Sequence, residues 1–194
     1  MTMLVILAVL AAIGLYVVMA YNGLVDRRNK VKNAFAQIDV QLTRRHDLIP
    51  NLVESVKGYM QHERATLEAV TAARKQAVSG LEAAAARPGD PAAMRQLASA
   101  EAALEGALGR LLAVVEAYPD LKADENMLRL QEELSSTENK VSFARQGYND
   151  AVMDYNTACE SFPTNLIAGA FRFEEAEFLE IESDAKREVP AVSF

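Results

Sequence analysis

Two histidines and one cysteine are the residues of this chain best suited to metal binding or nucleophilic chemistry. A di-iron carboxylate bundle needs Glu-x-x-His on two helices, but the residues three positions before His46 and His62 are threonine and tyrosine. The pair His62-Glu63 begins like a zincin motif, yet Thr66 stands where the second histidine is required. Neither a Gly-rich phosphate loop nor a Gly-x-Ser-x-Gly elbow occurs. We therefore expect no catalytic residues, no metal site and no cofactor, and we interpret the protein as non-enzymatic.

Charged residues that interrupt the apolar stripes are the second set of candidates, because an unpaired buried charge is costly. If the chain reverses near residue 88, Arg74 lies opposite Glu101, and we predict that these two side chains pair. A reversal near residue 47 would place Glu63 opposite Lys32 in the same way. Such pairs would set the helix register or the oligomer specificity. The alternative is that they are ordinary boundary charges whose heads reach water.

The elements that must position these residues begin with an uncharged N-terminal segment. No charged side chain occurs before Asp26, and the apolar run Leu4–Ala20 is long enough, with its flanks, to cross a hydrocarbon core of ~30 Å at ~1.5 Å per residue. The segment has no basic residues before its apolar run, and the run is longer than a usual signal-peptide core. We interpret it as an uncleaved transmembrane anchor, with a cleaved signal peptide as the alternative.

Aromatic and basic residues follow the apolar run. Tyr16 and Tyr21 suit the interfacial belt at its far end. Four cations come next: Arg27, Arg28, Lys30 and Lys32. The positive-inside rule then places the C-terminal domain on the cytoplasmic side, with the extracytoplasmic side as the alternative. The same cations are also suited to binding anionic headgroups.

Beyond the anchor, apolar residues recur at helical spacing and no stretch alternates like a strand. Runs with steps of three and four residues cover Val31–Leu42, Ile49–Leu81, Met94–Tyr118 and Met127–Phe162. We predict an all-α protein, with an N-terminal transmembrane helix followed by an antiparallel up-and-down four-helix bundle. The first run continues directly from the anchor, so the membrane span and the first bundle helix are expected to form one rod.

Proline-containing breaks separate these runs. Asp90 is suited to cap a helix that starts at Pro91, and Tyr118-Pro119-Asp120 separates the next two helices in the same way. The first break is open to two interpretations. Pro50 disfavours helix at the residue before it, which favours a tight turn at residues 46–50. A continuous helix with a proline kink is the alternative.

The C-terminal segment differs from the helical body. After Pro163, the apolar stretch Leu166–Phe171 is too short to span a bilayer, and apolar and acidic residues then alternate irregularly. One interpretation is a tail that folds back over one end of the bundle. The other is a partner or self-assembly motif anchored by Phe171, Phe173, Phe178, Leu179 and Phe194. The chain thus divides into an anchor (1–25), a four-helix bundle (26–162) and a tail (163–194).

Composition excludes some classes of function. The net charge of −7 and the pI near 5.0 argue against a nucleic-acid binder, and the absence of tryptophan argues against broad base-stacking platforms. The only cysteine, Cys159, cannot form an intrachain disulfide. We interpret it as a small residue that packs between helices.

Specific motifs are spread along nearly the whole chain. They include Ile38–Val53, Lys57-Gly58-Tyr59, Glu116–Ala123, Leu130–Leu134, Thr137–Lys140, Arg145–Asp150 and Tyr155-Asn156. By these residues the chain resembles the LemA family of bacterial membrane proteins. The resemblance implies an N-terminal anchor in the bacterial plasma (inner) membrane and a four-helix up-and-down bundle, and it implies no enzymatic reaction.

The resemblance also suggests a cellular context. Relatives include proteins involved in building magnetosome membranes, and family genes often neighbour those of membrane metalloproteases. The expected function is a membrane-tethered scaffold or adaptor that binds itself, as a homo-oligomer, or other membrane proteins such as a membrane protease. The alternative is a membrane-remodelling or lipid-binding protein that uses the basic juxtamembrane segment.

Overall fold

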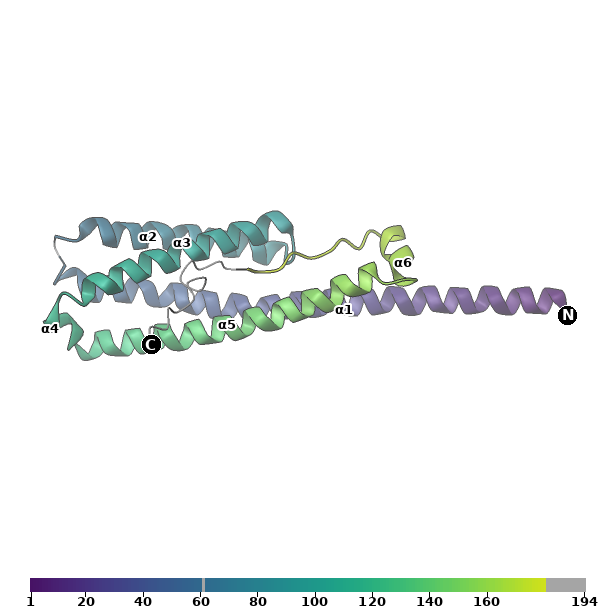
Figure 1. Cartoon of the computed structure of the whole chain (residues 1–194), viewed down its shortest axis with the longest axis horizontal. Helices are drawn as coiled ribbons and strands as arrows, with labels where there is room; N and C mark the ends of the chain where they lie inside the picture. The colour runs from purple at the N-terminus through teal and green to yellow at the C-terminus, as the bar shows by residue number, and fades with distance from the viewer. Residues whose placement is uncertain (61, 181–194) are drawn as a thin grey trace, which may run out of the picture.

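The computed structural model describes residues 1–60 and 62–180, and within them the chain is helical, with no strand. The helices are α1 (Thr2–Lys57), α2 (Arg64–Ala86), α3 (Pro91–Val115), α4 (Pro119–Lys122), α5 (Glu125–Glu160) and α6 (Thr164–Ala170). The predicted all-α fold is therefore confirmed. The four long helices α1, α2, α3 and α5 alternate in direction, with α2 and α3 lying together above α1 and α5 (Figure 1).

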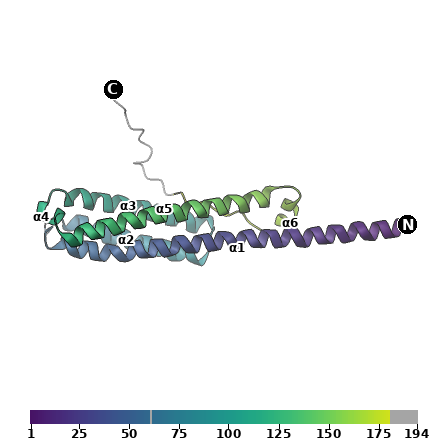
Figure 2. The same ribbon diagram turned by 90° about the horizontal axis from the view of Figure 1, so that it is seen from below.

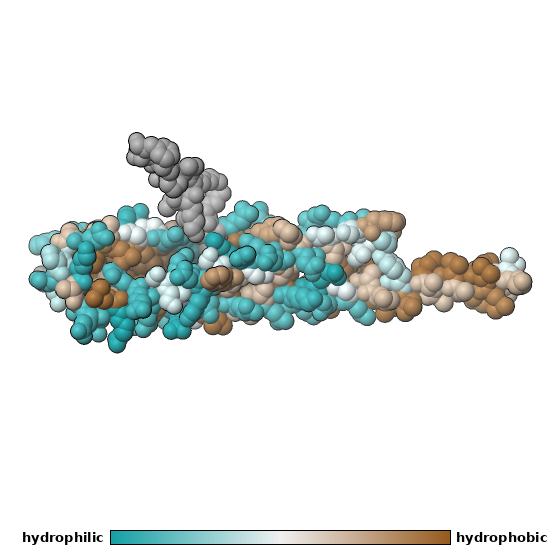
Figure 3. All heavy atoms as spheres, turned by 60° about the horizontal axis from the view of Figure 1, so that its bottom comes forward, coloured by the Kyte–Doolittle hydropathy of each residue, from teal (hydrophilic) through white to brown (hydrophobic). Residues whose placement is uncertain are grey.

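Helix α1 is one uninterrupted rod of 56 residues (Figures 1 and 2). Its N-terminal part projects beyond the rest of the molecule as a strongly apolar segment that is not buried and is long enough to cross a membrane (Figure 3). From Leu24 onward the same helix buries a stripe that includes Phe35 and Leu42. The apolar segment and the first bundle helix thus form the single rod that the sequence predicts.

The first reversal of the chain lies between the end of α1 at Lys57 and the start of α2 at Arg64, so the predicted turn at residues 46–50 is wrong and the continuous helix is correct. Pro50 lies inside α1 on its exposed face. A proline inside a helix costs about 3 kcal/mol. Beyond Leu42, the helix buries Ile49, Leu52 and Val56 on the same stripe, each contributing roughly 1.5–3 kcal/mol. Burial of this stripe therefore outweighs the local cost of the proline.

The later breaks fall where the sequence predicts them. The Asp90 carboxylate accepts a hydrogen bond of 2.9 Å from the Ala93 N–H, and Pro91 is the first residue of α3. Pro119 begins the short helix α4, after which Asp124 caps α5 by accepting from the N–H groups of Asn126 and Met127. The starts of these helices are therefore determined by side chains within the first turn.

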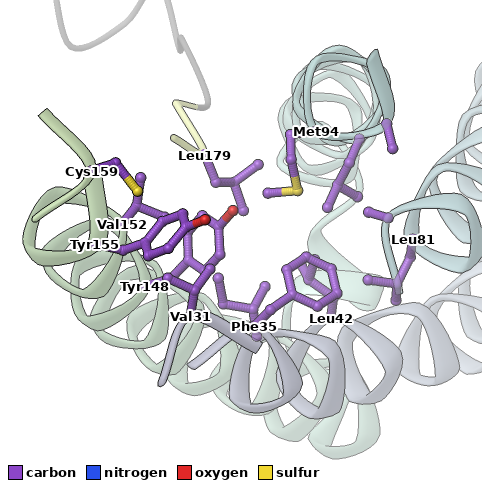
Figure 4. Packing of buried hydrophobic residues seen from close by; sticks show 14 of the residues in the cluster. Val31, Phe35, Leu42, Leu81, Met94, Tyr148, Val152, Tyr155, Cys159 and Leu179 are labelled. Carbon is purple, nitrogen blue, oxygen red and sulfur yellow. The ribbon is translucent and has the colours of Figure 1, made fainter. Parts of the chain in front are cut away.

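The core forms two clusters along the bundle. The distal cluster, at the α4 end, includes Leu52, Val70, Leu104, Leu111 and Leu121. The proximal cluster, towards the projecting part of α1, includes Phe35, Leu81, Met94, Tyr148 and Leu179. Figure 4 shows Leu179, from the C-terminal tail, pointing in between α5 and α3. The tail is therefore part of the core at this end.

Candidate partner-binding site

A buried cluster of charged side chains links α1, α3 and α5 between the two apolar clusters. Arg45 Nη2 lies 2.7 Å from Glu101 Oε2, and His46 Nε2 lies 2.8 Å from Glu101 Oε1. The other guanidinium nitrogen, Arg45 Nη1, donates to Glu138 Oε2 at 2.5 Å. Arg45, His46 and Glu101 are all buried, and the opposite charges of Arg45 and Glu101 compensate each other inside the protein. The cluster fixes three helices in one register.

The predicted pairing of Arg74 with Glu101 is wrong. Arg74 Nε instead donates to the main-chain carbonyl oxygen of His46 at 2.6 Å, and its Nη2 lies 4.0 Å from the Asp47 carboxylate. The turn between α2 and α3 lies where the prediction places it, so the two helices keep the assumed alignment, but both side chains bond to α1 instead of to each other. Arg74 lies opposite His46 and Asp47 of α1.

The predicted pairing of Lys32 with Glu63 is wrong because the first reversal lies between α1 and α2 rather than near residue 47. Glu63 precedes the first residue of α2, at the α4 end of the bundle (Figure 1). Lys32 lies at the other end, where it lines a hollow with Pro88 and Gly89 of the α2–α3 turn. The length of the bundle separates the two side chains.

The seam between α3 and α5 is open, whereas α1 packs closely along α5 and α2 along α3. A groove of about 540 Å³ runs along this seam. Its apolar lining is made by Leu108, Leu112, Val115, Leu128 and Leu134, and its polar lining includes Arg45, Glu105, Glu116, Lys122 and Glu138. We call this hollow the α3–α5 groove. It joins an apolar floor to a predominantly acidic rim.

The residues predicted to flank the membrane make contacts within the protein. Arg27 Nε pairs with Asp154 at 3.1 Å, Lys30 pairs with Asp26 at 2.9 Å, and the Arg28 guanidinium lies 5.0 Å from the centre of the Phe173 ring. The two predicted aromatic residues contact the C-terminal segment. The Tyr16 hydroxyl lies 3.3 Å from Thr164 Oγ1, and the Tyr21 ring packs edge-on against Phe171 and Phe173 at centroid distances of 5.0 and 5.5 Å.

The tail folds back along α5 as an extended segment, residues 173–180, which we call the strap. Phe173 and Leu179 are buried, as in the covering interpretation, whereas Phe171 and Phe178 are exposed. Phe194 lies outside the described residues. The strap also bonds to the α2–α3 turn, where the Glu177 N–H donates to the Gly89 carbonyl at 3.0 Å.

Side chains of α5 hold the strap through its backbone. Asn156 accepts from the Ala176 N–H and donates to the Ala176 carbonyl, both at 2.9 Å. Asn149 makes the same pair of bonds with Leu179, at 2.9 Å from its N–H and 3.3 Å to its carbonyl. The hydroxyls of Tyr148 and Tyr155 donate to the carbonyls of Glu177 and Glu174, respectively, at 2.8 and 2.9 Å. Burial raises the pKa of both tyrosine hydroxyls, which favours their protonated, hydrogen-bond-donating form.

The spacing of these residues explains the fit. The dipeptide Tyr-Asn occurs twice on α5, at Tyr148-Asn149 and Tyr155-Asn156, seven residues apart. Seven helical residues rise about 10.5 Å, which is close to the roughly 10 Å spanned by three extended residues. Each Tyr-Asn pair therefore meets an equivalent three-residue step of the strap. The sequence analysis predicted neither these contacts with the strap nor the bonds of Arg45 and His46 to Glu101. For the strap, the Tyr-Asn repeat was the available signal.

Metal-binding and nucleophilic groups do not gather elsewhere in the part of the chain described. No group of three His, Cys, Asp or Glu side chains suited to a metal ion occurs in residues 1–60 and 62–180. Cys159 is buried in the proximal cluster, and burial raises the pKa of its thiol, which disfavours the reactive thiolate. The candidate binding sites of the described residues are therefore the grooves and exposed faces of the bundle.

The fold and these surfaces define a class of protein: a helical bundle whose first helix continues into a long apolar segment. The chain belongs to the LemA family, which it matches over residues 34–194. Magnetosome protein MamQ 2 of Paramagnetospirillum magneticum is 26% identical over 180 residues, covering 84% of this chain and 65% of that protein. Protein LemA of Metamycoplasma hominis is 26% identical over 174 residues, covering 86% of this chain and 75% of that protein.

A third relative has a similar identity to the chain. Magnetosome protein MamQ of Magnetospirillum gryphiswaldense is 25% identical over 178 residues, covering 82% of this chain and 64% of that protein. The chain thus spans slightly less than two thirds of the length of the MamQ proteins it matches. The family resemblance predicted from the sequence motifs is confirmed.

Proposed function

We propose that this protein is a non-enzymatic, membrane-tethered adaptor that binds an amphipathic helix of a membrane-bound partner in the α3–α5 groove. The tether is the N-terminal part of α1, which is long and apolar enough to cross a bilayer. Because α1 continues into the bundle without a linker, the groove is held close to the membrane, at a distance set by the length of the rod. The LemA relationship is compatible with this function.

The observation that carries the proposal is the open seam. In a closed four-helix bundle, α3 and α5 would pack against each other as neighbours, whereas here leucines of both helices line a groove. Residues 105–115 of α3 line it over about three helical turns, or roughly 15 Å, which is a suitable length for helix-in-groove binding.

Charge favours one kind of occupant. The rim carries Glu105, Glu116 and Glu138 against Lys122, and Glu138 already bonds to Arg45. A helix with an apolar stripe and flanking lysines or arginines would complement this rim. A second copy of the chain, at a net charge of −7, would complement it less well. We therefore favour a basic amphipathic helix of another protein over self-association.

The juxtamembrane cations give less support to the alternative of a lipid-binding or remodelling protein. Arg27, Arg28 and Lys30 contact Asp154, Phe173 and Asp26, respectively, which partly neutralises or covers the basic segment. The adaptor function requires no such free cationic surface.

Site-specific photo-crosslinking in native membranes tests the adaptor function. A photoreactive residue at Leu112 in the groove should form an adduct with another protein, at a segment that carries basic residues beside an apolar stripe. The control position is Phe143, which is exposed and lies outside the groove. Glu105→Lys together with Glu116→Lys should reduce the adduct. Adducts with a second copy or with lipid, equal labelling from Phe143, or no effect of charge reversal would overturn the proposal.

A further inference from the structure

The segment that joins α5 to the strap leaves large apolar side chains exposed. Phe162, Leu166 and Phe171 are 80%, 63% and 54% exposed. No charged residue occurs from Ser161 to Phe171. We call residues 161–171, which include α6, the foot. Three large exposed apolar side chains within one short uncharged segment indicate a surface that is covered by another phase or molecule.

The position of the foot identifies what covers it. It lies against α1 where that helix leaves the bundle (Figures 1 and 2), with Thr164 beside the Tyr16 hydroxyl and Phe171 against the Tyr21 ring. A hydrocarbon core of ~30 Å corresponds to about 20 helical residues. If the core begins near the start of α1, its far boundary falls between Tyr16 and Tyr21, at the level of the foot.

Charges change sharply on either side of this level. The first charged residue of α1 is Asp26, and Glu160 and Arg172 bound the foot. The acidic strap runs from the foot back towards the bundle, away from the projecting part of α1 (Figure 1). Side chains suited to hydrocarbon therefore lie at one level, and charged side chains lie on the bundle side of it. This arrangement is typical of an interfacial element.

We propose that the foot inserts Phe162, Leu166 and Phe171 into the headgroup and upper acyl region of the bilayer beside α1, forming a second contact with lipid. This inference rests on the proposed membrane tether. One helix alone would leave the bundle free to rotate about its axis and to tilt. A second contact, joined to α1 through Tyr16 and Tyr21, restricts both motions and fixes which face of the bundle the membrane meets.

Depth-dependent fluorescence of the full-length protein in vesicles of phosphatidylcholine and phosphatidylglycerol tests this inference. Single cysteines replace Leu166 in the foot, Val9 in the projecting part of α1 and Phe143 on the bundle, in a Cys159→Ala background. Leu166 and Phe143 are both exposed apolar positions, so neither substitution should disturb the fold. Each cysteine carries an environment-sensitive fluorophore, which is challenged with aqueous iodide and with lipids brominated at shallow acyl positions.

The label at position 166 should emit at shorter wavelength than the label at 143, resist iodide several-fold better and be quenched by shallow brominated lipid. The label at position 9 should also resist iodide. If the label at position 9 resists iodide but the label at position 166 is quenched as strongly as the label at 143, insertion of the foot into the bilayer is excluded, while the membrane anchor is supported. Protection of 166 from both quenchers would mean that protein covers the foot, which also overturns the proposal. If position 9 is as accessible to iodide as 143, the anchor itself fails.

Discussion

Arg74 donates a hydrogen bond from Nε to the main-chain carbonyl oxygen of His46, with 2.6 Å between the two atoms. In a helix this carbonyl would accept from the N–H four residues later, but that residue is Pro50, which has no N–H. A side chain of α2 thus supplies the donor that α1 lacks. This relationship explains why an arginine interrupts the apolar stripe of α2.

Arg74→Leu should lower the free energy of unfolding by about 1–3 kcal/mol, because the His46 carbonyl would lose its partner in a partly buried seam. Pro50→Ala provides an N–H for the same carbonyl, so Arg74→Leu should cost clearly less in that background. Urea unfolding of the full-length protein in detergent micelles measures all four corners of this cycle. Arg110→Leu, at an exposed position of α3, is the control and should change stability by no more than about 0.5 kcal/mol. If Arg74→Leu lowers the free energy of unfolding equally with and without Pro50→Ala, the Arg74 side chain does not compensate for the N–H that Pro50 lacks.

Glu101→Leu should be more damaging, since it leaves Arg45 and His46 buried without their shared carboxylate. Removing one partner of a buried ion pair typically costs about 3–5 kcal/mol. The double variant Arg45→Met/Glu101→Leu should recover most of that loss, because it removes both charges. The same urea measurement applies, with the exposed Glu82→Leu as the matched control. A double variant that loses as much as the sum of the two single variants would exclude this explanation.

The sequence predicts those features of the fold that neighbouring residues determine. The start of α3 depends on Asp90 and Pro91, which act within one turn, and the α1 rod depends on an apolar pattern without interruption. The position of the first reversal depends instead on a balance between Pro50 and the burial of Ile49, Leu52 and Val56, which only the packed bundle decides.

The two candidate pairs fail for different reasons. Moving the first reversal from residues 46–50 to the segment between α1 and α2 separates Glu63 from Lys32, whereas Arg74 and Glu101 each bond to α1 instead of to each other. The strap could not be placed from the sequence for another reason. Its contacts use backbone groups of an extended segment, which leave no periodic pattern in the strap's own side chains. Only the Tyr-Asn repeat on α5 records them.

Asn156→Ala should release the middle of the strap. It removes the acceptor for the Ala176 N–H and the donor for the Ala176 carbonyl, so amide hydrogen exchange at Ala176 should accelerate. Because the loss of one or two hydrogen bonds contributes about 1–3 kcal/mol, the acceleration should be roughly five- to 150-fold. Asn139→Ala, at an exposed position of the same helix, should leave this exchange unchanged. An unchanged rate in Asn156→Ala would show that the Asn156 side chain does not hold the strap.

Alkaline pH should weaken the same attachment. Burial raises the pKa of Tyr148 and Tyr155 above the ordinary value of 10.0. The folded state therefore favours the protonated hydroxyls, so their contribution is complete below pH 10 and is lost as the pH rises above it. The unfolding free energy should fall by up to about 1.4 kcal/mol per pH unit for each tyrosine. Urea unfolding from pH 9 upwards should show a smaller decline for Tyr148→Phe/Tyr155→Phe, and an identical decline would exclude this origin.

Gly89→Ala tests the contact between the strap and the α2–α3 turn. Gly89 has a φ of +88°, and a Cβ added there would lie 2.9 Å from the Ala176 Cβ. The left-handed conformation alone costs an L-residue roughly 1–2 kcal/mol, and the close contact adds to this cost. Exchange of the Glu177 amide, which donates to the Gly89 carbonyl, should therefore accelerate while the unfolding free energy falls.

Two further variants separate these causes. Gly106 lies on the exposed face of α3 with nothing within 4 Å of an added Cβ, so Gly106→Ala should stabilise the protein by about 0.5–1 kcal/mol. Adding Ala176→Gly to Gly89→Ala removes the side-chain contact but not the backbone strain. Slow exchange at Glu177 should then return, while part of the stability loss persists because the φ penalty remains. If exchange stays fast in the double variant, the distorted turn rather than the contact with Ala176 controls the strap.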